Sequence, residues 1–142
     1  MKQSALVKNL VKKIEFAMIL GIGTDLVSIQ RVGQLLARHP VRGVQHLLHP
    51  GELAEADAAP SRERFVAKRF AAKEALAKAL GTGLRAPVLL PAIRVEHDTF
   101  GKPFFSFEPA LDEWIRQRSL QIHLSISDEV DHALAFVVVE SL

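Results

Sequence analysis

Apolar residues recur along the chain with two different spacings, and the spacing predicts which segments are strands and which are helices. A short apolar run over 18–23 is typical of a buried strand. Two later segments are also predicted as strands, because 121–127 alternates polar and apolar residues and 133–139 is almost continuously apolar. A further pair of strands, 92–97 and 103–107, is separated by Asp-Thr-Phe-Gly-Lys, which favours a hairpin turn.

Helical spacing predicts several helices, and the longest begins after Ser61 and ends at Leu80. Serine is a favoured N-cap residue, and Gly81 is typical of a helix end. Six alanines between Ala67 and Ala79 favour the helix and let other elements approach closely. Shorter helices are predicted over 26–39, 52–59 and 109–119. This order of elements predicts an α+β fold, a single domain over 18–142 with a small antiparallel or mixed sheet packed on a long central helix.

The first 17 residues lie outside this pattern. Their apolar positions recur at helical spacing, which predicts a short amphipathic helix containing Leu6, Val7, Leu10, Val11 and Ile14. Lysines interrupt the apolar positions, so the segment has no continuous apolar region or cleavage site of a secretory signal. We interpret residues 1–17 as an upstream start or an appended extension, with Met18 as the natural beginning.

The composition of the chain excludes several classes of structural and catalytic site. The chain has 142 residues, of which 49% are apolar and none is cysteine. One folded domain is therefore expected, without disulfides, a thiolate zinc site or a cysteine nucleophile, and any metal must be held by oxygen or imidazole ligands. No apolar run approaches the roughly 20 residues that cross a bilayer, so we expect no membrane span and a cytoplasmic protein.

The formal net charge is only +2, but the basic residues are unevenly placed. No acidic residue lies between Asp25 and Glu52, whereas Arg31, Arg38 and Arg42 and three histidines do. Such a segment favours a basic surface for an acidic protein, a phosphate or a nucleic acid, and the alternative is a solvated helix face. Aromatic residues are not interleaved with these charges, which argues against stacking of single-stranded nucleic acid.

Two carboxylates occupy positions where a charge is unexpected. Asp25 follows a strand and two glycines, where the backbone can approach a ligand, and Glu74 lies on a helix with apolar residues on both sides. The alternatives are an N-cap role for Asp25 and an ordinary ion pair between Glu74 and Lys78. If Asp25 and Glu74 converge, they form a two-carboxylate site suited to Mg²⁺ with water and phosphate as the remaining ligands.

Groups that could bind phosphate lie close to Glu74 in the sequence. Lys73 and Lys78 offer ammonium groups, and the loop Gly81, Thr82 and Gly83 offers backbone N–H groups, although that loop can also be a simple helix end. On the strand 121–127, alternation places His123, Ser125 and Ser127 on one face, where they either line a site or face solvent.

Four stretches strongly resemble the holo-[acyl-carrier-protein] synthase family of 4′-phosphopantetheinyl transferases. They are GIGTDLVSIQRV at 21–32, RFAAKEALAKALGTG at 69–83, FGKPFF at 100–105 and HLSISDEVDHALAFVVVE at 123–140. The resemblance implies transfer of the phosphopantetheine arm of coenzyme A to a serine of apo acyl carrier protein, with release of 3′,5′-ADP, for fatty acid biosynthesis. It also implies a Mg²⁺ cofactor and a homotrimer with the coenzyme A site between subunits.

The resemblance also implies a role for each matching residue. Asp25 and Glu74 would hold Mg²⁺, and Lys78 would contact the pyrophosphate and assist the leaving group. The chemistry of a serine hydroxyl also requires a general base, for which Glu74 is the candidate, either directly or through a metal-bound water. The implied nucleotide contacts are Lys73, Gly81, Thr82, Gly83, His123 and Ser125, and the implied carrier-protein contacts are Arg31, Arg38 and Arg42. Asp128 stands where the family commonly has a second histidine, so no catalytic role is assigned there.

Two other functions fit the same residues. One is a non-catalytic basic binding module, in which Asp25 is a helix cap and Glu74 forms a salt bridge. The other is a Mg²⁺-dependent phosphohydrolase that uses water instead of a serine hydroxyl.

Overall fold

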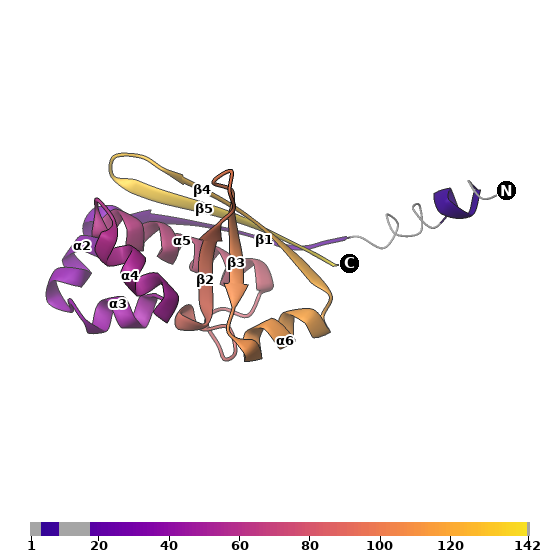
Figure 1. Ribbon diagram of the computed structural model, residues 1–142, viewed down its shortest axis with the longest axis horizontal. Helices are drawn as coiled ribbons and strands as arrows, with labels where there is room; N and C mark the ends of the chain where they lie inside the picture. Colours follow the sequence, from indigo (N-terminus) through magenta and orange to yellow (C-terminus); the bar gives the residue numbers. More distant parts are fainter. Residues whose placement is uncertain (1–3, 9–17, 142) are drawn as a thin grey trace.

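A three-stranded antiparallel sheet and one long helix form the centre of the molecule (Figure 1). The computed structural model describes residues 4–8 and 18–141. The sheet has the strand order β1–β5–β4, with bounds β1 Met18–Ser28, β4 Leu120–Asp128 and β5 His132–Ser141. These strands confirm the three predicted ones, and each extends beyond its predicted bounds because its backbone continues to pair with its neighbour.

Helix α5 (Arg62–Leu80) packs on one face of this sheet, as the α+β prediction requires. Its N-cap is Ser61, whose Oγ accepts a hydrogen bond from the backbone N–H of Arg64 at 3.3 Å. Its end is marked by Gly81 with φ of 73°, a left-handed conformation that glycine adopts at little cost. The alanines of α5 are buried, so the helix axis lies close to the strands.

The two glycines of β1 permit this close packing. A Cβ atom on Gly21 would lie 1.9 Å from the carbonyl oxygen of Ala79, and one on Gly23 would lie 2.0 Å from that of Ala75. The backbone at these glycines therefore approaches α5 and not a ligand, which corrects the expectation from the sequence. The strand also continues past them, since Asp25 pairs with Ala135 within the ladder.

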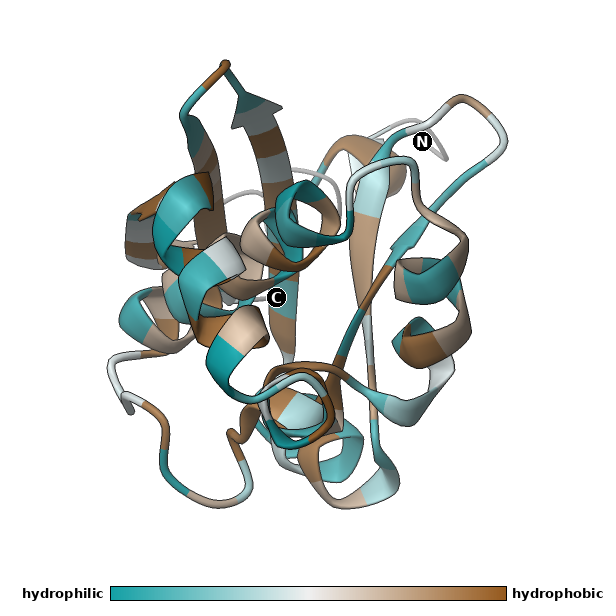
Figure 2. Ribbon diagram, turned by 90° about the vertical axis from the view of Figure 1, so that its left-hand side faces the viewer, coloured by the Kyte–Doolittle hydropathy of each residue, from teal (hydrophilic) through white to brown (hydrophobic). Residues whose placement is uncertain are grey.

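The remaining elements lie at the two ends of the central helix and between them (Figure 1). At one end lie α2 (Ile29–Arg38), α3 (Arg42–Leu47) and α4 (Pro50–Ala58), and towards the other lies α6 (Pro109–Gln117) (Figure 1). Between them, η1 (Leu90–Ala92) contacts α3 and leads into the hairpin of β2 (Ile93–His97) and β3 (Pro103–Phe107). The predicted hairpin is confirmed. Hydrophobic and hydrophilic bands alternate along the strands, as expected for sheets with one buried face (Figure 2).

Two features differ from the sequence prediction. The helix α3 was not predicted, because its six residues are too few to display a clear helical spacing. Within the first 17 residues, 4–8 are helical with Leu6 and Val7 exposed, whereas the other apolar positions of the predicted amphipathic helix lie outside the described residues.

Candidate active site

Asp25 reaches the site from the middle of β1. Side chains alternate between the two faces of a strand, so Asp25 shares the α5 face with Gly23 and the buried Val27. It does not cap a helix: Ser28 is the N-cap of α2, and its Oγ accepts a hydrogen bond from the N–H of Arg31 at 3.3 Å. The N-cap interpretation of Asp25 is therefore wrong.

Lys78 connects α5 to this strand. Its Nζ atom donates to Oδ1 of Asp25 at 3.1 Å and to the carbonyl oxygen of Thr24 at 2.8 Å. The side chain of Asp25 is 17% exposed and that of Lys78 is 55% exposed, so Lys78 reaches the mostly buried carboxylate from the solvent side. Lys78 thus pairs with Asp25, and within the described part of the chain it forms no ion pair with Glu74.

Glu74 lies one helical turn before Lys78 and is half-buried. Burial raises the pKa of its carboxyl group above the ordinary value of 4.5, the negative charge of Asp25 raises it further, and the charge of Lys78 opposes both effects. The charge of Asp25 thus acts on Glu74 across the space between β1 and α5.

Both carboxylates line one cleft of about 440 Å³. Arg31 and Phe70 also border it, so the cleft combines an acidic centre with a basic rim. The two carboxylates fit a hard divalent cation, because burial and the charge of Asp25 disfavour ionisation of Glu74 and a cation would offset both effects. Among residues 4–8 and 18–141 no group of three or more acidic, histidine or cysteine ligands gathers, so a cation here would take its other ligands from water and phosphate.

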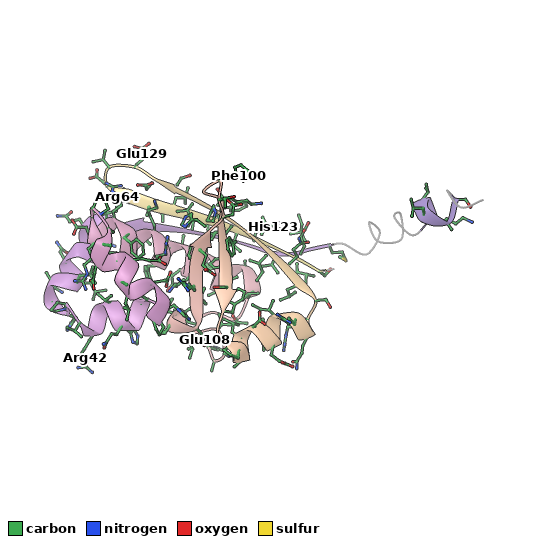
Figure 3. The ribbon with its side chains drawn as sticks, viewed as in Figure 1. Arg42, Arg64, Phe100, Glu108, His123 and Glu129 are labelled. Atoms are coloured by element: carbon green, nitrogen blue, oxygen red, sulfur yellow. The ribbon has the colours of Figure 1, made fainter. Side chains whose placement is uncertain are left out.

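A second cleft adjoins the first on its basic side. It measures about 450 Å³, shares Leu35 and Leu47 with the first, and is also lined by His39, Arg42 and His46. Arg42 projects from the molecule (Figure 3), and Arg38 is exposed in the last turn of α2 without lining either cleft. The structure therefore brings Arg31 and Arg42 to the site, and places Arg38 on the adjacent surface.

Lys73 lies in the protein interior and does not line the cleft, which corrects the expectation that it binds a nucleotide. Its side chain is fully buried, and its three N–H groups are used by Oε1 of Glu52 at 2.6 Å and by the carbonyl oxygens of Leu47 and Leu90 at 3.0 and 3.1 Å. No donor remains for a ligand. Sequence reasoning missed Glu52 as well, although its position three residues after His49 at a helix start is typical of a capping box.

The loop after α5 lies just beyond Lys78. Gly81 and Gly83 have φ of 73° and 62°, and a Cβ atom on either would meet nothing within 4 Å, so the loop is open to solvent. Gly81 and Thr82 line a small cavity of about 260 Å³ together with Arg85 and Trp114. The N–H groups of Gly81 and Gly83 are donated to the carbonyl oxygens of Lys78 and Ala77, which corrects the expectation that both are free to bind phosphate. The Arg85 guanidinium lines the cavity and can bind an anion there.

His123 and Ser125 lie on the opposite face of the sheet from Asp25. Ser125 pairs with Phe136, which is 40% exposed, whereas Asp25 pairs with Ala135, which is fully buried against α5. His123 Nε2 lies 2.8 Å from Oε2 of Glu140 on this outer face. A single chain therefore does not bring His123 and Ser125 to the cleft of Asp25 and Glu74.

The outer face of the sheet is also apolar, which the sequence did not reveal. Four large apolar side chains on it are 40% to 64% exposed: Ile22, Leu26, Leu134 and Phe136. The neighbouring β4–β5 turn is fixed to α5, since Arg64 donates to Oδ2 of Asp128 at 2.8 Å and to the carbonyl oxygen of Glu129 at 2.7 Å (Figure 3). Asp128 thus serves as an anchor for this turn.

The whole arrangement matches a known family. Residues 21–137 match the model of the 4′-phosphopantetheinyl transferase superfamily. The chain belongs to that superfamily. No helix within 4–8 and 18–141 is long and apolar enough to cross a membrane.

Relatives in the superfamily are similar over nearly their full length. A holo-[acyl-carrier-protein] synthase of Laribacter hongkongensis is 57% identical over 124 residues, which are 87% of this chain and 99% of that protein. One of Dechloromonas aromatica is 50% identical over 123 residues, covering 87% and 98% of the two chains.

Solved structures of superfamily members share the fold. The holo-[acyl-carrier-protein] synthase of Neisseria meningitidis has a TM-score of 0.84 and 46% identity, covering 87% of this chain and all of that one. The synthase of Bacillus anthracis, solved in complex with coenzyme A (3′,5′-ADP), has a TM-score of 0.73 and 35% identity, covering 88% and 99%.

Proposed function

We propose that this transferase moves the 4′-phosphopantetheine arm of coenzyme A to a serine of apo acyl carrier protein and so supplies fatty acid biosynthesis in the cytoplasm. The observation that supports it most is the single cleft shared by Asp25 and Glu74 beside Lys78, in a chain similar to synthases over almost their whole length. The serine oxygen forms a bond to the phosphorus that carries pantetheine, and the bond from that phosphorus to 3′,5′-ADP breaks.

Three residues of the chain have distinct roles in the proposed reaction. Asp25 and Glu74 would hold Mg²⁺, which neutralises and positions the oxygens of the pyrophosphate when it is bound. Lys78 places its ammonium group on the solvent side of Asp25, where it can leave Asp25 and bind a phosphate oxygen. Glu74 would accept the serine proton, directly or through a water molecule, because it is the carboxylate on α5 that lines the cleft.

We further propose a homotrimer that completes the site. His123 and Ser125 face away from the cleft of their own subunit, and the apolar side chains around them are suited to a subunit contact. A ring in which the outer face of one sheet packs beside the next subunit's cleft would bring His123 and Ser125 to the 3′,5′-ADP end of the substrate. The loop Gly81–Gly83, at the C-terminal end of α5, would bind the same nucleotide from its own subunit.

The carrier protein is proposed to dock on the basic side of the cleft. Arg31 borders the catalytic cleft and Arg42 borders the adjoining one, with Arg38 on the surface beside them. No acidic residue is present in the chain from 26 to 51, so α2 and α3 present basic side chains and no carboxylates of their own to an acidic partner.

Mass spectrometry of the acceptor tests this function. Purified protein is incubated with coenzyme A, Mg²⁺ and apo acyl carrier protein, and matched samples contain a chelator or a carrier with its serine replaced by alanine. We expect the carrier to gain about 340 Da only in the complete mixture, as transfer of one phosphoryl-linked arm requires. Cleavage of coenzyme A without any gain in carrier mass would instead indicate a phosphohydrolase, and no change in either would indicate a binding module.

A further inference from the structure

A buried cluster of three charged side chains lies behind the catalytic carboxylates. Glu52 and Lys73 are fully buried and Arg69 is 6% exposed. Oε1 of Glu52 accepts from Nζ of Lys73 at 2.6 Å and from the N–H of His49 at 2.9 Å. Oε2 accepts from the N–H of Val95 at 3.1 Å and lies 3.1 Å from Nε of Arg69. The carboxylate of Glu52 is therefore fully engaged.

Lys73 extends this cluster to other parts of the chain. Its remaining donors bind the carbonyl oxygen of Leu47, at the end of α3, and that of Leu90, at the start of η1. Through one ammonium group, α5 is thus held to α3, α4 and η1, at the residue immediately before Glu74.

Holding a helix in place through buried charges costs free energy, because the charged groups lose their hydration. Lys73 and Glu52 are both removed from water, and their contact at 2.6 Å offsets only part of the free-energy cost of burying two charges. Apolar residues of similar volume often stabilise a core as well as a buried ion pair does, or better. Stability alone therefore does not account for the cluster, whereas its directed hydrogen bonds fix an orientation that apolar contacts do not fix.

Helix α5 has a particular need for such a constraint. Its buried apolar residues lie all around the helix, and only Leu76 among them is large; the others are Val66, Ala67, Ala71, Ala72, Ala75, Ala77 and Ala79. A helix with small apolar side chains on every side has no single stripe that sets its rotation. At a radius of about 6 Å, a rotation of about 10° moves a side-chain end by about 1 Å. Catalytic groups tolerate only about 0.5 Å.

We propose that the Glu52–Lys73 pair is a positioning device that fixes the rotation of α5 and thereby directs Glu74 towards Asp25. Both are positioning residues, since neither lines the cleft. The inference rests on the proposed function in one respect, which is that Glu74 and Asp25 hold a divalent cation together.

The test measures Mn²⁺ binding directly, by the electron paramagnetic resonance signal of the free ion, with and without coenzyme A. Lys73→Met removes the charge, and the double variant Glu52→Gln/Lys73→Met removes both charges so that none is left unpaired. Arg69 keeps a partner in the double variant, because its Nη2 lies 3.3 Å from Oε2 of Glu55. Arg64→Met is the matched control, since it breaks an anchor of the same helix far from Glu74.

We expect both Lys73 variants to weaken Mn²⁺ binding by about tenfold or more, because cation affinity follows the placement of its ligands. Arg64→Met should bind Mn²⁺ as the unchanged protein does. In the transfer reaction the Lys73 variants should lower kcat and leave the KM for coenzyme A nearly unchanged. A purely structural role predicts that the double variant, once folded, regains normal Mn²⁺ affinity, and that result would overturn the inference. Failure of the unchanged protein both to bind Mn²⁺ and to transfer the arm would reject the proposed function, and the inference with it.

Discussion

The Nζ atom of Lys78 lies 3.1 Å from Oδ1 of Asp25, although 53 positions separate the two residues in the sequence. The contact exists because the glycines of β1 let α5 lie directly on the strand. The geometry of the candidate site therefore depends on the distance between one strand and one helix, and it can be perturbed from either side.

Gly23→Ala should damage the fold through that distance. The added methyl group would lie 2.0 Å from the carbonyl oxygen of Ala75, which is backbone and cannot move alone. We expect a loss of at least about 3 kcal/mol in the free energy of unfolding, measured by denaturant titration. Gly33→Ala is the control, because its methyl group would make only ordinary contacts with Glu63 and should stabilise α2 by about 0.5 to 1 kcal/mol. Equal stability of the two variants would contradict the close packing.

Lys78→Met should separate catalysis from stability. The ion pair with Asp25 is formed from the solvent side, so its loss should change the free energy of unfolding by less than about 1 kcal/mol. Transfer should fall by about 100-fold, because a charge directed at the phosphates is lost. The measurement is the rate of carrier modification, with Lys68→Met on the same helix as control. A Lys78 variant as active as this control would remove Lys78 from the mechanism.

Glu74→Gln should make the metal-free protein more stable at neutral pH. Because the folded-state pKa of Glu74 lies above 4.5, the folded state binds more protons than the unfolded state above that pH. The free energy of unfolding therefore falls as pH rises through the folded-state pKa. The glutamine variant does not ionise at this position and does not show this decrease. Thermal unfolding with a chelator should show a higher Tm for the variant at pH 7 and no difference below pH 4. A lower Tm at pH 7 would indicate that the carboxylate is not destabilised there.

Mixing two inactive variants should restore activity if the site is shared between subunits. Asp25→Asn removes one half of the proposed site and His123→Ala removes the other, which lies on the outer sheet face. In randomly mixed trimers, about a quarter of the sites would combine an intact Asp25 with an intact His123 from the next subunit. Unfolding and refolding the two variants together should therefore restore about a quarter of the transfer rate. No restoration beyond that of separately refolded variants would argue against a shared site.

Local sequence patterns were sufficient to predict most of the fold. The helix from Arg62 to Leu80 follows from its alanines, its serine cap and its terminal glycine, all of which act within a few residues. The strands follow from their apolar spacing. The sequence left open whether Asp25 and Glu74 converge, and the structure places both on one cleft.

The errors have a common physical origin in contacts between distant residues. Lys73 was expected to bind a nucleotide, but the structure buries it. Its partners Glu52, Leu47 and Leu90 lie 21, 26 and 17 positions away, and no local sequence pattern indicates contacts over such separations. The glycines of β1 were interpreted as room for a ligand, whereas they give room for α5. The outer-face position of His123 relative to Asp25 depends on strand order, which spacing along one strand does not determine.

The central claim is that Asp25 and Glu74 act together on coenzyme A through one divalent cation, and carrier modification by variants of each tests it most directly. Asp25→Asn and Glu74→Gln keep side-chain size, and Asp57→Asn on the surface of α4 is the control. At saturating Mg²⁺, the gain of about 340 Da on the carrier should appear at least about 100-fold more slowly with either site variant, and at the normal rate with the control. Transfer at the normal rate by either site variant would contradict the account.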